Sequence, residues 1–218
     1  VPQVFDESNK DFREAYSLLK ELLSEEEYKS ARASVNNAHY TDLNVIEAMY
    51  EAIESFGFKK GKILEPSMGV GNFFSVIPDS LQESKLYGVE IDDISGRISK
   101  QLYQKAQINI CGFEETKFAD NFFDIAIGNV PFGDIKVFDR DYNKHNLNIH
   151  DYFFIKSIDK LKVGGILAFM TSKGTLDKLN PNVRKMMAEK ADFLGAVRLP
   201  NTAFKDVAGT DATSDIIF

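Results

Sequence analysis

The 218-residue chain contains few residues of several types, and each scarcity excludes certain kinds of protein. A single cysteine, Cys111, excludes an internal disulfide and is typical of a reducing compartment, so we expect a cytoplasmic protein. No apolar run approaches the length of a membrane span, and the opening VPQVFDESNKDF does not resemble a signal peptide. The chain has 26 Lys and Arg against 33 Asp and Glu, a net charge of −7. This balance argues against strong nucleic-acid binding by this chain alone, because phosphate contacts need clustered cations.

Histidine is also scarce, and two of the three, His145 and His150, lie in HNLNIHD. Their spacing lacks the helical H-x-x-x-H pattern and a nearby cysteine, so we expect no metal site. We expect the two imidazoles to order the surrounding loop or to help cover an active site. The chain also lacks an initiator Met and stops at SDIIF, inside a strand-like pattern. We therefore expect it to be part of a longer protein.

From Lys62 onward the chain alternates between strand-like and helix-like segments. The seven strand-like segments are 62–68, 85–91, 106–112, 123–130, 164–172, 193–200 and 213–218. Helical patterns occupy 92–104, 149–161 and 181–190. This alternation predicts an α/β fold, a doubly wound sandwich with a mostly parallel sheet covered on both faces.

The first 36 residues are predicted to form a helical extension, and residues 37–218 the main domain. Ser8 with Asp11, and Ser24 with Glu27, resemble capping boxes that begin two helices. A further helix is expected from 42 to 56, where apolar residues recur at helical spacing. The pattern leaves open whether the extension docks other parts of the protein or only covers the sheet.

Ligands of open α/β sheets bind beyond the carboxyl ends of the strands. The first predicted strand runs into EPSMGVGNFF, where Gly69 and Gly71 allow a tight turn against a ligand, although Phe74 replaces the third glycine of a dinucleotide fingerprint. The second ends in GVEI, which places Glu90 nineteen residues past Gly71, where its carboxylate can accept hydrogen bonds from ribose hydroxyls. A purely structural turn and a solvated strand end are the alternatives. Together the two features favour an adenosine-type cofactor.

Aromatic residues follow the next two predicted strands. Phe113 comes after the third, where it either stacks on a purine ring or packs in the core. The fourth ends in NVPF (129–132), which joins a turn-forming Asn and a rigid Pro to a Phe that needs an apolar partner. The longest irregular stretch, 133–148, follows directly. Long loops in compact domains are often functional, so the sequence predicts a site at this edge.

Taken in order, these motifs resemble those of S-adenosylmethionine-dependent adenine-N6 DNA methyltransferases. The matching segments are NAHYT (37–41), EPSMGVG (65–71), GVEID (88–92), NVPF (129–132), GGILAFMTSKGTLD (164–177) and RLPNTAF (198–204). With HDYFF (150–154) added, the chain is similar to the methylase module of large methylase–helicase fusions of bacterial mobile elements and phages. The resemblance implies a Rossmann-like seven-stranded methyltransferase sandwich, S-adenosyl-L-methionine as cofactor, and double-stranded DNA as partner. It also implies that the DNA is gripped mainly by parts of the protein outside this chain.

The resemblance also assigns site residues. The cofactor would be bound by His39, Tyr40, Thr41, Glu65, Pro66, Ser67, Met68, Gly69, Gly71, Asn72, Phe73, Glu90, Ile91, Gly112, Phe113, Asn129 and Pro131. The catalytic tetrapeptide would be Asn129, Val130, Pro131 and Phe132, and the flipped adenine would lie between Phe132 and Phe204. Two positions depart from the family: Val130 replaces a Pro whose carbonyl is what the family uses, and Gly112 stands where many relatives have Asp.

Two other functions stay open at this point. Protein glutamine methyltransferases use an Asn-Pro-Pro-Tyr tetrapeptide on a side-chain amide, but they usually lack a segment like HYT before the glycine loop. A methyltransferase fold kept only as a scaffold would explain Val130 and Gly112 as signs of decay. The intact Asn129, Phe132 and Glu90 argue against a scaffold. Phe204 itself has an ordinary alternative as a core residue.

Overall fold

The computed structural model describes residues 2–37, 41–200 and 213–218. All seven predicted strands form, and they make one sheet with the order β3-β2-β1-β4-β5-β7-β6. Their bounds are β1 (Lys62–Glu65), β2 (Lys85–Glu90), β3 (Gln107–Ile110), β4 (Phe123–Asn129), β5 (Leu161–Ser172), β6 (Ala196–Arg198) and β7 (Ser214–Ile217). Strand β7 runs antiparallel to β5 and β6, while β1 to β5 pair in parallel. The carboxyl ends of the first five strands therefore share one edge.

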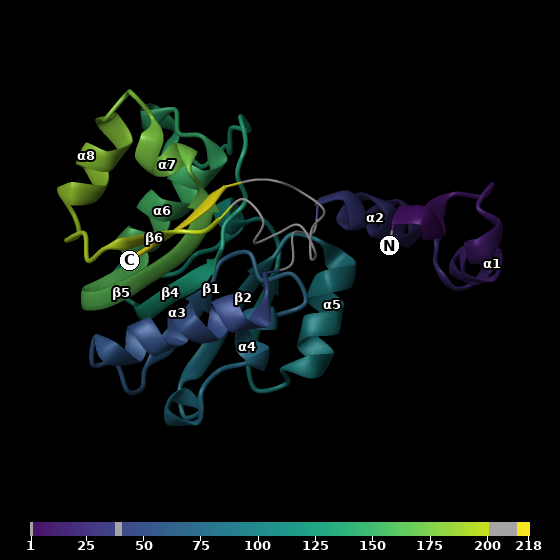
Figure 1. Cartoon of the computed structure of the whole chain (residues 1–218), viewed down its shortest axis with the longest axis horizontal. Coiled ribbons are helices and arrows are strands. Elements are labelled where there is room, and N and C mark those ends of the chain that lie inside the picture. The colour runs from purple at the N-terminus through teal and green to yellow at the C-terminus, as the bar shows by residue number, and fades with distance from the viewer. Residues whose placement is uncertain (1, 38–40, 201–212) are drawn as a thin grey trace.

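Helices cover both faces of this sheet (Figure 1). The α-helices are α1 (Arg13–Leu22), α2 (Glu25–Asn37), α3 (Leu43–Ser55), α4 (Asn72–Ser75), α5 (Asp93–Leu102), α6 (Ile149–Lys160), α7 (Gly174–Asp177) and α8 (Asn182–Ala188). Short 3-10 turns are η1 (Pro2–Phe5), η2 (Lys10–Phe12), η3 (Asp79–Leu81), η4 (Phe113–Glu115) and η5 (Asn143–His145). None of the helices in the described ranges has the length and apolar composition that a membrane crossing requires.

Two apolar clusters fill the space between the sheet and these helices. On one face α3 buries Ile46, Met49, Tyr50 and Ile53, the side chains spaced for this in the sequence, against strands β1 and β4. On the other face four consecutive residues of α6, 152–155, pack against β2, β4 and β5. Since a sheet buried on both faces has little freedom to shift, its carboxyl edge is a rigid base for the loops that follow each strand.

The two N-terminal helices extend from the side of the main domain, and α2 lies next to α5 (Figure 1). The capping box at Ser24 is confirmed: Ser24 N–H donates to the Glu27 carboxylate at 2.9 Å, and Glu27 N–H donates to Ser24 Oγ at 3.2 Å. The prediction for Ser8 was wrong. Asn9 caps η2 instead by accepting from the Asp11 N–H, because Ser8 Oγ is bonded to Asp6.

Candidate functional site

The predicted site residues that the structure describes gather at the carboxyl edge of the sheet. Glu65 ends β1, Glu90 ends β2 and Asn129 ends β4. Thr41, just before α3, is buried. His39, Tyr40 and Phe204 lie outside the described residues.

The loop after β1 has the backbone conformation that its glycines predict. Gly69 and Gly71 adopt positive φ angles of 55° and 87°, a region that favours glycine. The loop is held by its neighbours: Ser99 Oγ of α5 donates to the Gly69 carbonyl, and Tyr103 OH donates to the Gly71 carbonyl, both at 2.7 Å. A side chain at Gly71 would collide with the Tyr103 ring, whereas the space beside Gly69 is open. The turn therefore leaves open space beside Gly69, while the N–H and carbonyl of Gly69 are both hydrogen-bonded within the protein.

The acidic residue that ends β2, Glu90, is hydrogen-bonded to this loop. Glu90 accepts from Gly69 N–H at 2.6 Å and from Asp92 N–H at 2.8 Å. Burial raises the pKa of Glu90, and these two hydrogen bonds act in the opposite direction. Next to it, Ile91 leaves 74% of its side-chain surface exposed, which is unusual for an isoleucine at a strand end.

A second carboxyl group lies deeper in the same region. Glu65 is 1% exposed, and its Oε2 is one of the buried side-chain atoms without a hydrogen-bond partner among the described residues. Burial raises the pKa of Glu65 well above its ordinary value, and the negative charge of Glu90 raises it further. Burial thus favours the protonated form of Glu65 over the charged form.

The tetrapeptide after β4 is tied to the glycine loop. Ser67 Oγ donates to the Asn129 carbonyl at 2.9 Å, which joins the loop after β1 to the end of β4. The strand ends at Asn129, one residue earlier than predicted, but Val130 is buried and its N–H donates to the Met170 carbonyl at 3.1 Å. Pro131 and Phe132 are half-buried. The backbone on both sides of Asn129 is therefore fixed.

Other predicted cofactor residues are brought to the same edge, but several of their side chains point into the core. The side chains of Met68 and Phe73 are 3% exposed, and Pro66 is also buried. Asn72 and Ser67 are half-buried. The three buried residues can contact a ligand at this edge only through backbone atoms. Asn72 and Ser67 retain accessible side-chain surface.

Phe113 was expected either to stack on a purine ring or to pack in the core, and its ring packs in the core. Its ring is 2% exposed and packs against Phe153 and Tyr152 of α6, with ring centroids 5.1 Å and 6.1 Å away. The preceding Gly112 keeps its carbonyl on Glu115 N–H at 3.0 Å. Cys111 is half-buried beside the same cluster.

A buried network of charged and polar residues lies beneath the long loop, and the sequence did not predict it. Lys156 of α6 is 3% exposed and donates to the Phe113 carbonyl at 2.7 Å and to the Asp139 carboxylate at 2.9 Å. Tyr152 OH donates to the same Asp139 oxygen at 2.7 Å. The one available signal was the spacing of Tyr152 and Lys156, which places them on one helix face. The network attaches the loop after the tetrapeptide to the end of β3.

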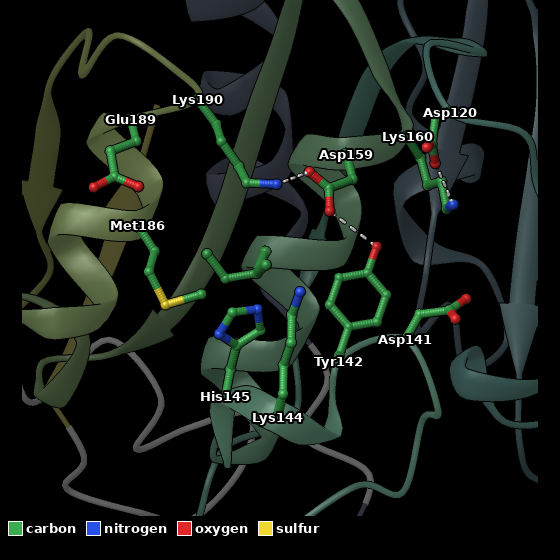
Figure 2. A pocket seen from close by; sticks show the side chains of 11 residues that line it. Asp120, Asp141, Tyr142, Lys144, His145, Asp159, Lys160, Met186, Glu189 and Lys190 are labelled. Carbon is green, nitrogen blue, oxygen red and sulfur yellow. Dashed lines mark hydrogen bonds and ion pairs between the residues drawn. The ribbon is translucent and has the colours of Figure 1, made fainter.

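The two histidines of the loop region, His145 and His150, lie in different surroundings. His150, at the start of α6, is 5% exposed beside Asp151, and burial lowers its pKa. Lys178 donates to Asp151 at 2.8 Å and joins this cluster. His145 lies at the end of η5, on the wall of a hollow of about 350 Å³ between the loop, α6 and α8 (Figure 2). Among the predicted cofactor, catalytic and base-binding residues that the structure describes, none lines this hollow.

The chain is similar in sequence to a family of methylases and to a phage protein. The family model described as Eco57I restriction-modification methylase matches residues 14–204. Defense against restriction protein B of Escherichia phage P1 is 31% identical over 185 residues, which cover 82% of this chain. The chain spans only 8% of the length of that relative.

Solved structures agree on the architecture. A Listeria monocytogenes protein assigned to the class I S-adenosylmethionine-dependent methyltransferases superimposes with a TM-score of 0.70 at 18% identity, over 99% of this chain and 76% of the other. A modification subunit assigned to a type I restriction enzyme of Vibrio vulnificus gives 0.67 at 18% identity, over 95% and 48%. Identities this low identify the fold alone, which is the Rossmann-like fold of class I methyltransferases.

Proposed function

Because the chain belongs to the Eco57I restriction-modification methylase family, we propose that it methylates the N6 amine of an adenine flipped out of double-stranded DNA. One observation carries the proposal: the 2.9 Å hydrogen bond from Ser67 Oγ to the Asn129 carbonyl. It joins the glycine loop to the tetrapeptide, so a ligand on the loop and a base on the tetrapeptide would be neighbours.

The residues around Glu90 fit S-adenosylmethionine. The Glu90 carboxylate would accept from the ribose hydroxyls, and the exposed Ile91 side chain offers the apolar surface that a purine ring covers. The open space beside Gly69 would let the cofactor approach the backbone closely, and the unpartnered Glu65 Oε2 would accept from a cationic amino group, whose charge favours the ionised carboxylate. When bound, the cofactor supplies a methyl group on an electrophilic sulfonium.

The tetrapeptide would prepare the amine to accept that methyl group. The lone pair of an adenine amine is delocalised into the ring, so the amine is a poor nucleophile. The Asn129 side-chain oxygen and the Val130 carbonyl would accept its two hydrogens and draw the nitrogen toward tetrahedral geometry. Pro131 restricts the backbone, and Phe132 would stack on the base. The gain in rate would come from positioning and electrostatics, without a strong general base.

The remaining assignments belong to the same proposal. We infer that residues 1–36 form an extension to a catalytic domain of 37–218, in which Thr41 begins the cover over the cofactor. A net charge of −7 and the greater length of the phage relative support a DNA grip supplied mainly by other parts of the protein. Phe204 would be the second ring against the adenine.

Labelled S-adenosylmethionine tests the proposal directly. The wild-type protein is expected to label adenine in DNA, whereas label in protein or no label at all would contradict the proposal. Asn129→Ala should abolish transfer and leave affinity for the cofactor within about threefold, because Asn129 acts on the acceptor. Asn109→Ala, which removes an exposed Asn from edge strand β3, is the matched control. A melting curve on each variant separates loss of chemistry from loss of folding.

A further inference from the structure

The loop that follows the tetrapeptide presents large apolar side chains to solvent. Phe138 is 82% exposed and Ile135 is 60% exposed. A single exposed apolar residue is common on protein surfaces. Here two of them lie on one loop, and this loop begins at the proposed base site.

The residues on both sides of Phe138 are anchored inward. Val137 packs against the core cluster of α6, and Asp139 is 7% exposed. The Asp139 carboxylate is held by Tyr152 OH at 2.7 Å and by Lys156 Nζ at 2.9 Å. Turning Phe138 inward would pull Asp139 off a buried ammonium, which is costly. The ring is therefore held outward by its neighbours.

The rest of the loop is fixed as well. Ile149 N–H donates to the Ile135 carbonyl at 2.8 Å, and Lys136 Nζ donates to the Asn146 carbonyl at 2.7 Å. On the far side Tyr142 OH donates to Asp159 at 3.0 Å, and Lys190 holds the other oxygen of that carboxylate (Figure 2). A loop tied at these points presents Phe138 in one place, so little entropy is lost when a partner covers the ring.

The charge of this loop is more favourable for contact with a polyanion than the net charge of the whole chain. Residues 133–148 contain three Asp and three Lys or Arg, whereas the chain carries a net charge of −7. One of those acids, Asp139, is neutralised by Lys156, which lies outside the loop. Arg140 is exposed two positions from Phe138. The exposed surface of the loop is thus not acidic.

We propose that residues 133–148 form a DNA wedge, in which Phe138, supported by Ile135, stacks against the base pairs beside the target adenine. Extruding a base leaves a gap in the stack, and proteins that distort DNA commonly fill such gaps with apolar side chains. This inference rests on the proposed function and names the contact that this chain makes with the flanking duplex.

The first test compares duplex with single-stranded DNA. Because a single strand has no paired stack to open, Phe138→Ala should lower kcat/KM on a mixed-sequence adenine-containing duplex about tenfold or more, the loss expected for one stacking ring. On the separated strands the change should stay within about twofold, below the loss of a stacking contact. Phe193→Ala, which removes another exposed Phe ahead of β6, should change neither value. Equal loss on both forms, or no loss on the duplex, would overturn the wedge.

A second test does not depend on methyl transfer. The chain contains no Trp, so Phe138→Trp introduces a single indole reporter. Adding the duplex should quench its fluorescence, while the indole of Phe193→Trp should be unaffected. If the duplex binds and neither indole responds, or both respond equally, the wedge is refuted even when methylation is intact. If the wild type methylates neither form of DNA while the Phe138→Trp indole is still quenched, the wedge stands and the proposed reaction fails.

Discussion

Replacing the buried Glu65 with Gln should make the stability of the protein less dependent on pH. Glu65 is 1% exposed, and burial raises its pKa well above the ordinary value of 4.5. The folded state keeps the proton, whereas the unfolded state releases it once the pH exceeds that value. The stability of the wild type should therefore fall as the pH rises between the ordinary and the folded pKa. Gln cannot ionise, so the variant lacks this loss.

The magnitude follows from the width of that pH window. Each pH unit above the ordinary pKa costs the wild type about 1.4 kcal/mol until the folded pKa is reached. The loss accumulates from the ordinary pKa of 4.5 upward and stops growing at the folded pKa. The buried amide of Gln brings a cost of about 1–3 kcal/mol where it lacks partners, but that cost does not vary with pH. The slope with pH is thus the decisive quantity.

Urea denaturation at pH 5, 6, 7 and 8 measures this slope. The free energy of unfolding of Glu65→Gln relative to the wild type should rise by about 1.4 kcal/mol per pH unit through this range, up to the folded pKa. Glu83→Gln, at an exposed carboxylate paired with Lys60, is the matched control and should show no such rise. Parallel profiles for Glu65→Gln and the wild type would refute a protonated Glu65.

Three further changes have distinct expected outcomes. Glu90→Ala should weaken binding of S-adenosylmethionine by about 1–3 kcal/mol in calorimetry, and equal affinity would contradict the ribose contact. Lys156→Met should cost about 3–5 kcal/mol in urea denaturation because it leaves the Asp139 charge unpaired, and adding Asp139→Asn should recover part of that loss; no recovery would argue against the ion pair as the cause. Phe204→Ala should lower transfer to DNA with little effect on the melting temperature, whereas a stability loss of about 3–5 kcal/mol would place Phe204 in the core.

The fold was predictable because its signals are local. Seven apolar segments with helical patterns between them led to the observed strands, with ends displaced by a few residues. The capping box at Ser24 was recognised for the same reason, since both partners lie within one turn. At Ser8 the same pattern failed because a second acceptor, Asn9, and a second partner, Asp6, compete for the same groups. A run of six polar residues, 6–11, does not determine which of them caps the helix.

The details of the site depended on contacts between distant residues. Phe113 follows a strand whether it stacks on a ligand or packs in the core, and only the position of α6 decides for the core. Lys156 lies 17 residues from Asp139 and 43 from Phe113 along the chain. A lysine on a helix is normally solvated, so no local pattern predicts that this one is buried with three hydrogen-bonding partners.

The position of Lys156 links the two halves of the proposed reaction. Its ammonium group donates to the Phe113 carbonyl, on the proposed cofactor side, and to the Asp139 carboxylate, which anchors the loop of Phe138 on the proposed DNA side. Both contacts lie out of water, where charged hydrogen bonds are strongest and hardest to replace. A shift of the β3 end would therefore be transmitted to the base of the DNA wedge through Lys156, together with Tyr152, which packs against Phe113 and donates to Asp139. Variation at Lys156 should accordingly disturb cofactor affinity and the duplex-specific part of the activity together, whereas variation at Phe138 should disturb only the second.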